Sequence, residues 1–449
     1  MVLYCIVLLE GFVTISLEIL TIRQLMPLVG NSVVVTSLII GIFLLFLAYG
    51  YRKGGTYQTH FSAILKKNFT LAAVGLGIGL SYTFIETFFN LWKTIHSTST
   101  LLPLIIYLLL IIAPIVYLLG QTVPITLNLW KKKQTLAAVG GQVLHISTIG
   151  SFLGATCTAL LLFNYFGVAW TVVIDFCILA GLTLLLMNLN TEKTRCIFLL
   201  CIGTLVYWLN VSFENSFFLA TNNYANYEIV SNPAEKYLII NDSNSSYTNN
   251  KKQGFAYIEL IKKILFTDLK LQNKNILVLG AGGFTLSAEN TYDNHFTYVD
   301  IDQQIATIVK NNFLPEISGA FVADDAKHYL KNAEVHYDAI VSDAYNNQHA
   351  IPSHLLTREY FLAIKNSLVD NGVAIFNILA QPSLDNHYSK RVDNTIRAVF
   401  SSCMVVPFSF AEHVDTNIIY VCRKFKSEND RSLYTDNLNR AALDFFEMI

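Results

Sequence analysis

The residues of this chain best suited to chemistry are a glycine run and an acidic residue that follows it. The run is Gly280-Ala281-Gly282-Gly283, directly after the apolar stretch 275–279, and Asp300 comes twenty residues after Gly280. A strand, a tight glycine turn, a helix and an acidic residue closing the next strand form a nucleoside-binding half-fold. Glycine lets the backbone pass close to a ligand, and the carboxylate can accept both ribose hydroxyls. The spacing therefore predicts a site for a nucleotide-type cofactor.

Polar residues also end the neighbouring predicted strands. We expect strands at 275–280, 296–300, 319–323, 337–342, 372–378, 403–408 and 416–422. In doubly wound sheets, ligands lie across the carboxyl ends of the strands. The residues at those ends are Gly280 to Gly283, Asp300, Asp302, Asp324, Asp325, Asp343 and Tyr345. Asp302 and Asp324 also suit helix N-caps, so it is the set, rather than any single aspartate, that predicts a binding site.

The order of these elements predicts an α/β, Rossmann-like domain. Seven strands alternate with helices and the last two form an antiparallel hairpin, as in the class I methyltransferase-type variant of the doubly wound sheet. A β-hairpin at 226–231 and 236–241 is expected ahead of it. The polar stretch 241–253 is expected to be a loop, 254–269 a helix, and 284–290 a helix after the glycine run.

The first half of the chain has a different character. Overall, 53% of residues are hydrophobic and 14% charged, which is too apolar for an average soluble protein and too polar for a chain that is membrane throughout. Stretches of about twenty apolar residues predict an α-helical transmembrane bundle of seven spans. They are residues 2–22, 32–51, 69–91, 100–120, 136–163, 168–188 and 196–213.

Two domains follow from this division: a multi-span membrane domain over residues 1–213 and an α/β domain over residues 214–449. The expected location is the cell (inner) membrane, with the lipid bilayer as a partner. The net charge of -1 gives no sign of a nucleic-acid partner. A charged helix is expected at the end of the sequence, over residues 427–449.

Basic residues are unequally shared between the two sides of the predicted bundle. One side has Arg23 and Lys93. The other has Arg52, Lys53, Lys66, Lys67, Lys131, Lys132, Lys133, Lys193 and Arg195. The positive-inside rule then puts the N-terminus in the cytoplasm, and an odd number of spans puts the α/β domain outside it. Because soluble nucleoside cofactors are made inside the cell, the side of this domain stays open here.

Ionisable residues at or near membrane depth allow two hypotheses. They are Glu10, Glu18, Glu86, His145 and Asp175. An ionised group there costs about 2.5 to 3.5 kcal/mol on insertion scales. Such residues could form a polar cavity or a cation and proton path, or they could make interhelical hydrogen bonds, with Glu18 paired to Arg23. Gln121, Pro124 and the Gly140-Gly141 pair suggest a broken or closely packed region in the middle spans.

The seven cysteines show neither a CxxC pair nor the spacing of a metal site. Five lie in apolar runs, and Cys403 and Cys422 lie in predicted strands. We therefore expect all of them to be buried small hydrophobic residues, and we expect no metal site.

Two strings in the second half carry a family resemblance. Tyr337 to Tyr345 reads YDAIVSDAY, and Ile351 to Phe361 reads IPSHLLTREYF. Together they resemble the spermidine synthase (polyamine aminopropyltransferase) family, in its membrane-fused bacterial branch. The resemblance covers about residues 224 to 424. The multi-span first half, with Leu9-Glu10-Gly11 and Gly120 to Pro124, is similar to that branch too.

The resemblance implies transfer of an aminopropyl group from decarboxylated S-adenosylmethionine to an amine. Its cofactor-binding positions would be Gly280, Gly282, Gly283, Asp300, Asp302, Asp325 and Ala326. Among these, Asp300 would bind the ribose, and Asp325 with Ala326 would face the adenine. Asp343 matches the catalytic aspartate, and Tyr345 lies beside it. A carboxylate can take the proton of an ammonium group, and a sulfonium is itself a leaving group, so the reaction needs no metal.

The chain departs from the family pattern at two places. Residues Tyr345-Asn346-Asn347 stand where family members have an acidic residue and a proline. The stretch 241–252 has a serine in place of a glutamine, and there the family's Asp-Glu pair and Tyr-His-Glu run are missing. A diamine needs anionic partners at its far end, because an unpaired buried charge is costly. The acceptor, whether a polyamine or a membrane-delivered amine, therefore stays open.

Three hypotheses remain at this stage. The first is an aminopropyl or related alkyl transferase, and the second is a methyltransferase that uses S-adenosylmethionine itself. The third is a transporter or membrane scaffold with a degenerate nucleoside-sensing domain. His349 and His354 are additional candidates for proton transfer. A homodimer is a candidate assembly.

Overall fold

The computed structural model describes residues 2–30, 33–95, 101–129, 135–188, 191–289, 291–345, 351–410 and 414–424. The chain divides into two compact units. The first is Met1–Lys251 with Thr307–Pro315 and Tyr345–Pro352, and the second is Lys252–Ala306, Glu316–Ala344 and Ser353–Ile449. The expected domain boundary at residue 213 stays a prediction, as does the helix at 427–449, which lies outside the described residues.

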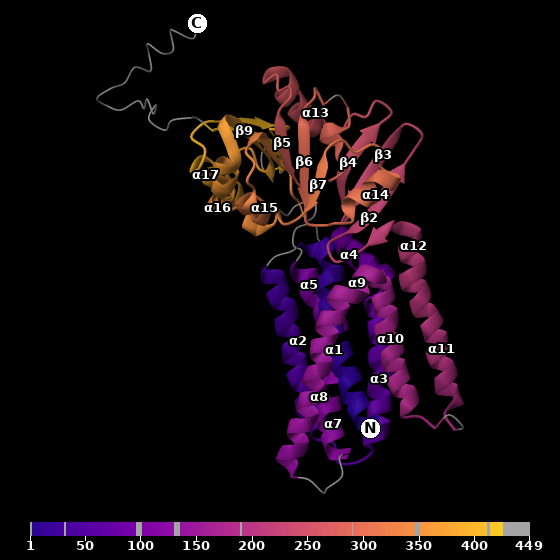
Figure 1. Ribbon diagram of the computed structural model, residues 1–449. Coiled ribbons are helices and arrows are strands. Elements are labelled where there is room, and N and C mark those ends of the chain that lie inside the picture. Colours follow the sequence, from indigo (N-terminus) through magenta and orange to yellow (C-terminus); the bar gives the residue numbers. More distant parts are fainter. Residues whose placement is uncertain are drawn as a thin grey trace. The chain divides into compact units, whose positions relative to one another are not determined.

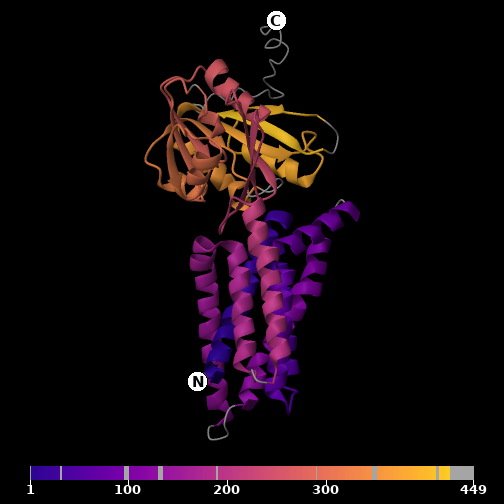
Figure 2. The same ribbon diagram turned by 90° about the vertical axis from the view of Figure 1, so that its right-hand side faces the viewer.

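The first unit contains a bundle of long apolar helices (Figures 1 and 2). Among the described residues, seven helical stretches are long and apolar enough to cross a membrane, as predicted. They are Val2–Val29 (α1), Val33–Gly54 (α2), Phe61–Gly79 (α3), Leu101–Leu129, Ala137–Tyr165, Gly167–Leu185 (α10) and Lys193–Phe217.

Three of these stretches are composite, each with one π-helical turn. The fourth joins α5 (Leu101–Tyr107), η1 (Leu108–Ile112), α6 (Ala113–Gly120) and α7 (Thr122–Leu129). The fifth joins α8 (Leu136–Cys157), η2 (Thr158–Leu162) and α9 (Phe163–Tyr165). The seventh joins α11 (Lys193–Tyr207), η3 (Trp208–Ser212) and α12 (Phe213–Phe217).

The third span lies earlier in the chain than predicted. Its helix, α3, ends at Gly79, and a separate helix, α4 (Tyr82–Ile95), follows. The Ser81 hydroxyl donates to the Ile78 carbonyl at 2.6 Å and accepts from the Phe84 amide at 3.2 Å, so it satisfies backbone groups at the break. The apolar run 69–91 therefore belongs to two helices, which hydropathy alone does not separate.

Helices α1 and α8 approach each other at backbone distance. A Cβ atom added to Gly150 would lie 2.1 Å from the Leu8 carbonyl oxygen, and one added to Gly154 would lie 2.2 Å from that of Phe12. The expectation of close packing at Gly140-Gly141 is wrong, because added Cβ atoms there would meet nothing within 4 Å. Small residues do mediate the helix contact, but three turns further along α8.

Hydrogen bonds connect polar residues inside the bundle. The Ser16 hydroxyl donates to Asp175 Oδ2 at 2.6 Å, and the Thr158 hydroxyl donates to Ser16 at 2.8 Å. Arg23, expected to pair with Glu18, donates instead to the Asn222 carbonyl at 2.6 Å and to Asn226 Oδ1 at 2.8 Å. Three helical segments are thus joined at Asp175, as the hydrogen-bonding hypothesis expects.

A four-stranded antiparallel sheet completes the first unit. Its strands, in sheet order, are β1 (Ala220–Thr221), β2 (Asn226–Ser231), β3 (Glu235–Ile240) and β4 (Ser243–Asn249). The predicted hairpin is confirmed as β2 and β3, but the predicted loop at 241–253 is wrong. Asn241 and Asp242, with φ of 52° and 60°, form a two-residue turn, which requires positive φ at both positions, and β4 follows directly.

The second unit is built on a seven-stranded sheet in the order β10-β11-β9-β8-β5-β6-β7 (Figure 1). Strands β5 to β9 pair in parallel, and β11 is antiparallel to both of its neighbours, as predicted for a class I methyltransferase-type sheet. The strands are β5 (Asn275–Leu279), β6 (His295–Asp300), β7 (Ala320–Ala323), β8 (Tyr337–Ser342), β9 (Leu368–Ala380), β10 (Cys403–Pro407) and β11 (Thr416–Arg423).

Short helices connect these strands. They are α13 (Ala256–Lys262) with η4 (Lys263–Asp268), α14 (Ile305–Asn312), α15 (Ala326–Asn332), η6 (Ser353–Leu355), α16 (Arg358–Ser367) and α17 (His387–Arg397). The helix predicted at 284–290 is instead a single 3₁₀ turn, η5 (Thr285–Ser287). Phe284 precedes it with φ of 57°, a left-handed conformation that prevents a regular helix from starting there.

The prediction that all seven cysteines are buried small hydrophobic residues is wrong at five positions. Cys403 and Cys422, which face each other on β10 and β11, form a disulfide. The remaining five cysteines are unpaired, and Cys5, Cys177 and Cys201 are exposed on helices of the first unit. An apolar neighbourhood in the sequence does not reveal which strands become partners, so the pairing could not be predicted.

Candidate functional site

Backbone hydrogen bonds beyond the ends of the strands bring the predicted site residues to one edge of the sheet. The Gly280 amide donates to the Val299 carbonyl at 2.9 Å, and the Asp343 amide donates to the Leu279 carbonyl at 2.8 Å. The Asp324 amide donates to the Asp300 carbonyl, also at 2.9 Å. The carboxyl ends of β8, β5, β6 and β7 are therefore neighbours at one edge of the sheet.

Gly280 needs to be glycine for two reasons. Its φ is +94°, and a Cβ atom at this position would lie 2.3 Å from the Asp343 carbonyl oxygen. The turn after β5 therefore runs directly against the backbone of the predicted catalytic residue. Gly282 also has positive φ, at 48°, and Gly283 continues the turn. This glycine turn leaves backbone rather than side chains at the edge of the sheet, as a nucleoside site requires.

Asp300 connects the end of β6 to the glycine turn. Its Oδ2 accepts from the Ala281 amide at 2.9 Å, and its Oδ1 accepts from the Asp302 amide at 3.0 Å. Desolvation raises the pKa of Asp300 above the usual value, although the two amides act in the opposite direction. Both oxygens keep a further lone pair, so the carboxylate can accept hydroxyl groups without breaking the turn.

Asp302, also predicted to bind the cofactor, lies buried in the turn before α14. Its Oδ1 accepts from the Gln304 amide at 2.9 Å. Asp302 therefore makes the helix-capping contact that the sequence analysis gave as the alternative to cofactor binding.

Asp343 lies between two side chains from other elements. Its Oδ1 accepts from Asn377 Nδ2 at 2.8 Å, and its Oδ2 accepts from the Tyr257 hydroxyl at 3.1 Å. Desolvation raises the pKa of Asp343, while the bonds from Asn377 and Tyr257 lower it and the net direction is upward. A carboxylate that is oriented by two donors and holds a proton more readily than an ordinary aspartate is suited to general-base work.

Tyr257 on α13 and Asn377 on β9 were not predicted as site residues. Residues Tyr257-Ile258-Glu259 have the first and last residue types of the Tyr-His-Glu run that was expected in residues 241–252. Asn377 could have been recognised from the sequence as the single amide side chain in an otherwise apolar strand, Val373 to Leu379.

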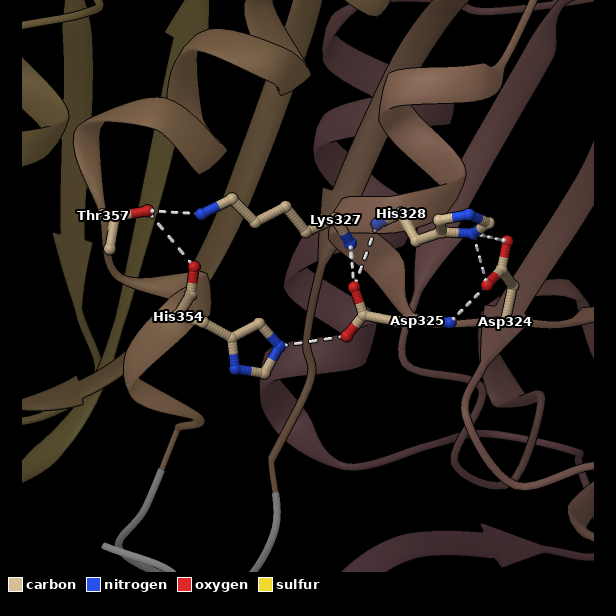
Figure 3. Close-up of polar contacts among 6 residues, drawn as sticks. All are labelled: Asp324, Asp325, Lys327, His328, His354 and Thr357. Carbon is tan, nitrogen blue, oxygen red and sulfur yellow. Dashed lines mark hydrogen bonds and ion pairs between the residues drawn. The ribbon is translucent and has the colours of Figure 1, made fainter. Parts of the chain in front are cut away.

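Asp325 has three structural partners, shown in Figure 3. Its Oδ1 caps α15 by accepting from the amides of Lys327 at 3.0 Å and His328 at 2.9 Å, so the cap is Asp325 rather than Asp324. Its Oδ2 accepts from His354 Nε2 at 3.0 Å. Desolvation would raise the pKa of Asp325, but the bonds from His328, His354 and Lys327 outweigh it, so the pKa is lowered.

The surroundings of Asp325 join three elements. The His328 ring contacts Asp324 at 2.8 Å, and Lys327 Nζ donates to Thr357 Oγ1 at 3.2 Å, beside the start of α16 (Figure 3). Ala326 is buried as the first residue of α15. His354 contacts Asp325, and this contact gives it a place on the predicted adenine side of the site.

The remaining candidates are less well placed. Tyr345 is the last described residue before 351 and belongs to the first unit, so its catalytic role stays a prediction. His349 lies outside the described residues. Among the His, Cys, Asp and Glu residues that the structure describes, no group of three is arranged to hold a metal ion.

Residues 254–433 match the family model described as the spermine/spermidine synthase domain. The chain is 31% identical over 160 residues to a polyamine aminopropyltransferase of Vibrio vulnificus, an alignment that covers 34% of this chain and 51% of the relative. It is 29% identical over 139 residues to polyamine aminopropyltransferase 2 of Hyperthermus butylicus, with 28% and 45% covered. The chain thus spans about half the length of the curated relatives it matches.

A probable spermidine synthase from Corynebacterium glutamicum is 20% identical, with a TM-score of 0.40, and the similarity covers 46% of this chain and 81% of that one.

Proposed function

We propose that this chain, whose residues 254–433 match the model of the spermine/spermidine synthase domain, is a membrane-anchored aminopropyltransferase. The reaction would move an aminopropyl group from decarboxylated S-adenosylmethionine to an amine. The observation that carries the proposal is the position of Asp343. It directly follows β8 and lies against the Gly280 turn, and Tyr257 and Asn377 donate hydrogen bonds to its two carboxylate oxygens.

The residues at the edge of the sheet fit a nucleoside donor substrate. The glycine turn presents backbone rather than side chains at this edge, and it lies so close to the Asp343 backbone that a Cβ atom at Gly280 would clash with it. Asp300 is fixed by two backbone amides with its carboxylate at the end of β6, where a ribose would be bound. Asp325 and Ala326, at the start of α15, are the positions for the adenine. The sulfonium of the donor supplies the activated carbon and the leaving group.

Asp343 would act on the acceptor. An ammonium group has no free lone pair, so it must lose a proton before its nitrogen can attack carbon. Desolvation raises the pKa of Asp343, which makes the ionised carboxylate a better proton acceptor. The hydroxyl of Tyr257 and the amide of Asn377 would hold the carboxylate in one orientation while the amine binds. The proton leaves the amine for Asp343, and the nitrogen lone pair then forms the new bond to carbon.

The proposal is tested by mass spectrometry of the products. Purified full-length protein is incubated with decarboxylated S-adenosylmethionine and a panel of primary amines, diamines and amine-bearing lipids. We expect an amine that gains an aminopropyl group, and we expect the Asp343→Asn variant to lose at least about 10²-fold in rate, the usual contribution of a general base. If the folded protein transfers nothing to any amine, while still binding the donor, the proposed activity is wrong.

The same assay separates the proposal from methyl transfer. The glycine turn and Asp300 would serve S-adenosylmethionine equally well, because the two molecules share the adenosyl group. Parallel reactions with S-adenosylmethionine should leave the amines unmodified. A methylated amine in these reactions would favour the methyltransferase hypothesis.

A further inference from the structure

The cysteines of the chain are divided by chemical state between the two units. Five cysteines, namely Cys5, Cys157, Cys177, Cys196 and Cys201, lie on helices of the first unit and are unpaired. The second unit contains two cysteines, Cys403 and Cys422, and they form a disulfide. The α/β unit thus has no free thiol.

The disulfide is built into the sheet rather than placed on a loose segment. Cys403 and Cys422 are directly opposite each other in the antiparallel pair β10 and β11, with their Cα atoms 4.1 Å apart. Cys422 is fully buried, and its strand also pairs with β9 through Ala374. Both strands are thereby held in the register that brings the two sulfur atoms together.

Disulfides of this kind form and persist in oxidising compartments, outside the cytoplasm. Two thiols yield one disulfide with release of two protons and two electrons, which a disulfide-bonded oxidant of such a compartment accepts. In a reducing cytoplasm, the same pair would be kept as thiols. The disulfide therefore indicates on which side of the membrane the α/β unit folds.

The charge distribution of the helical bundle gives an independent indication. Basic residues lie at the ends of the helices that share a side with the start of α1. Those described are Arg52, Lys53, Lys66, Lys67, Lys193 and Arg195. Glu192 joins two of these helix ends, because its carboxylate contacts Lys66 Nζ at 2.5 Å and Arg195 Nη1 at 2.9 Å. By the positive-inside rule, this end of the bundle is cytoplasmic.

The seven apolar stretches then determine where the chain leaves the membrane. The start of α1 and the helix α12 lie at opposite ends of the bundle (Figures 1 and 2). The chain therefore leaves the seventh apolar stretch on the side opposite to the basic end of the bundle.

We infer that the α/β unit lies outside the cytoplasm and that Cys403–Cys422 is oxidised there. The topology does not depend on the proposed function. Combined with that function, it means that the amine acceptor, and the sulfonium donor with it, are taken from the non-cytoplasmic side of the membrane. A membrane-delivered or external amine is then the class of acceptor to test first.

Reporter fusions in a bacterial host test the topology. Alkaline phosphatase, which is active only where disulfides form, and green fluorescent protein, which fluoresces only when it folds in the cytoplasm, are each fused after Ile449 of the full chain. We expect an active phosphatase and a dark fluorescent protein. The same reporters fused after Thr56, next to Arg52 and Lys53, should give the reverse result. A fluorescent fusion with inactive phosphatase after Ile449 would overturn the inference.

Thiol counting tests the disulfide itself. Membranes are denatured with a polyethylene glycol maleimide, which adds a visible mass for every free thiol. We expect five additions without reductant and seven after reduction, and five under both conditions in a Cys403→Ala, Cys422→Ala double variant. Seven additions without reductant would overturn the inference. Neither experiment measures transfer, so failure of the topology and failure of the proposed activity give different results.

Discussion

Asp343 is held from two sides, and this arrangement decides how the proposed reaction depends on pH. The residue must be ionised to accept a proton, so activity is lost as the pH falls through its pKa. Because desolvation raises that pKa, we expect the acid limb of kcat/KM to lie at higher pH than for an ordinary aspartate. The measurement is the pH dependence of kcat/KM with the best amine of the panel.

The pKa of Asp343 also predicts the direction in which a variant at Tyr257 moves the acid limb. The Tyr257 hydroxyl donates to Asp343 Oδ2 and lowers the pKa of the carboxyl. Tyr257→Phe should therefore move the acid limb to still higher pH, with donor binding unchanged. Asn377→Ala should move it in the same direction, since Asn377 bonds the other oxygen. A limb that stays in place in both variants would show that Asp343 is not the group that titrates.

Gly280 allows a test of the glycine turn. Gly280→Ala puts a methyl group 2.3 Å from the Asp343 carbonyl oxygen and forces alanine into a left-handed conformation, which alone costs about 1–2 kcal/mol. We expect both donor binding and transfer to be lost.

Gly319→Ala is the matched control for this variant. Gly319 also has a positive φ, of 122°, but its neighbour is Phe296 rather than a site residue. This variant should lower the thermal stability while the folded protein still binds the donor. Equal loss of binding in both variants would mean that the effect of Gly280→Ala comes from unfolding.

At the scale of the elements, the contact between α1 and α8 depends on backbone proximity. A methyl group at Gly150 or Gly154 would clash with the carbonyl oxygens of Leu8 or Phe12. We expect Gly150→Ala and Gly154→Ala each to destabilise the bundle by about 1 to 3 kcal/mol, the usual cost of overpacking. Thermal unfolding in detergent measures this.

Two glycines on the same helix serve as controls. Added Cβ atoms at Gly140 and Gly141 would meet nothing within 4 Å, so Gly140→Ala and Gly141→Ala should leave the melting temperature unchanged or raise it slightly. If all four variants behave alike, the close approach of α1 and α8 is not what stabilises the bundle.

The sequence predicts well those elements whose pattern is local. Seven spans, the alternation of strands and helices and the polar ends of the strands all follow from hydropathy, periodicity and turn residues. The misplaced third span has a local cause that hydropathy cannot detect, because Ser81 ends one apolar helix and begins another. The turn at Asn241 and Asp242 was missed because the strand after it, β4, is rich in polar residues.

The parts of the site that could not be predicted from the sequence are contacts between residues far apart in the chain. Asp343 could be located from its strand end, but its two donors come from α13 and β9, at separations of 86 and 34 residues. The disulfide depends in the same way on which strands become neighbours. Sequence periodicity identifies strands, whereas their pairing in the sheet decides which side chains meet.

At the scale of the whole molecule, one chain contains an apolar helical bundle and an α/β unit. If the seven apolar stretches cross a bilayer, the full chain should stay in the membrane pellet after an alkaline carbonate wash and require detergent for release. Immunoblotting of the pellet and the supernatant measures this. Release of the intact chain by carbonate alone would contradict membrane anchoring.

The most direct test of the central claim is isothermal titration of the detergent-purified protein with decarboxylated S-adenosylmethionine and with S-adenosylmethionine. We predict that the decarboxylated form binds more tightly, that Asp300→Ala abolishes binding, and that Asp343→Asn retains it, since Asp343 is assigned to the acceptor. If the folded protein binds neither molecule, the edge of this sheet is not a site for an adenosyl sulfonium and the proposed function is wrong.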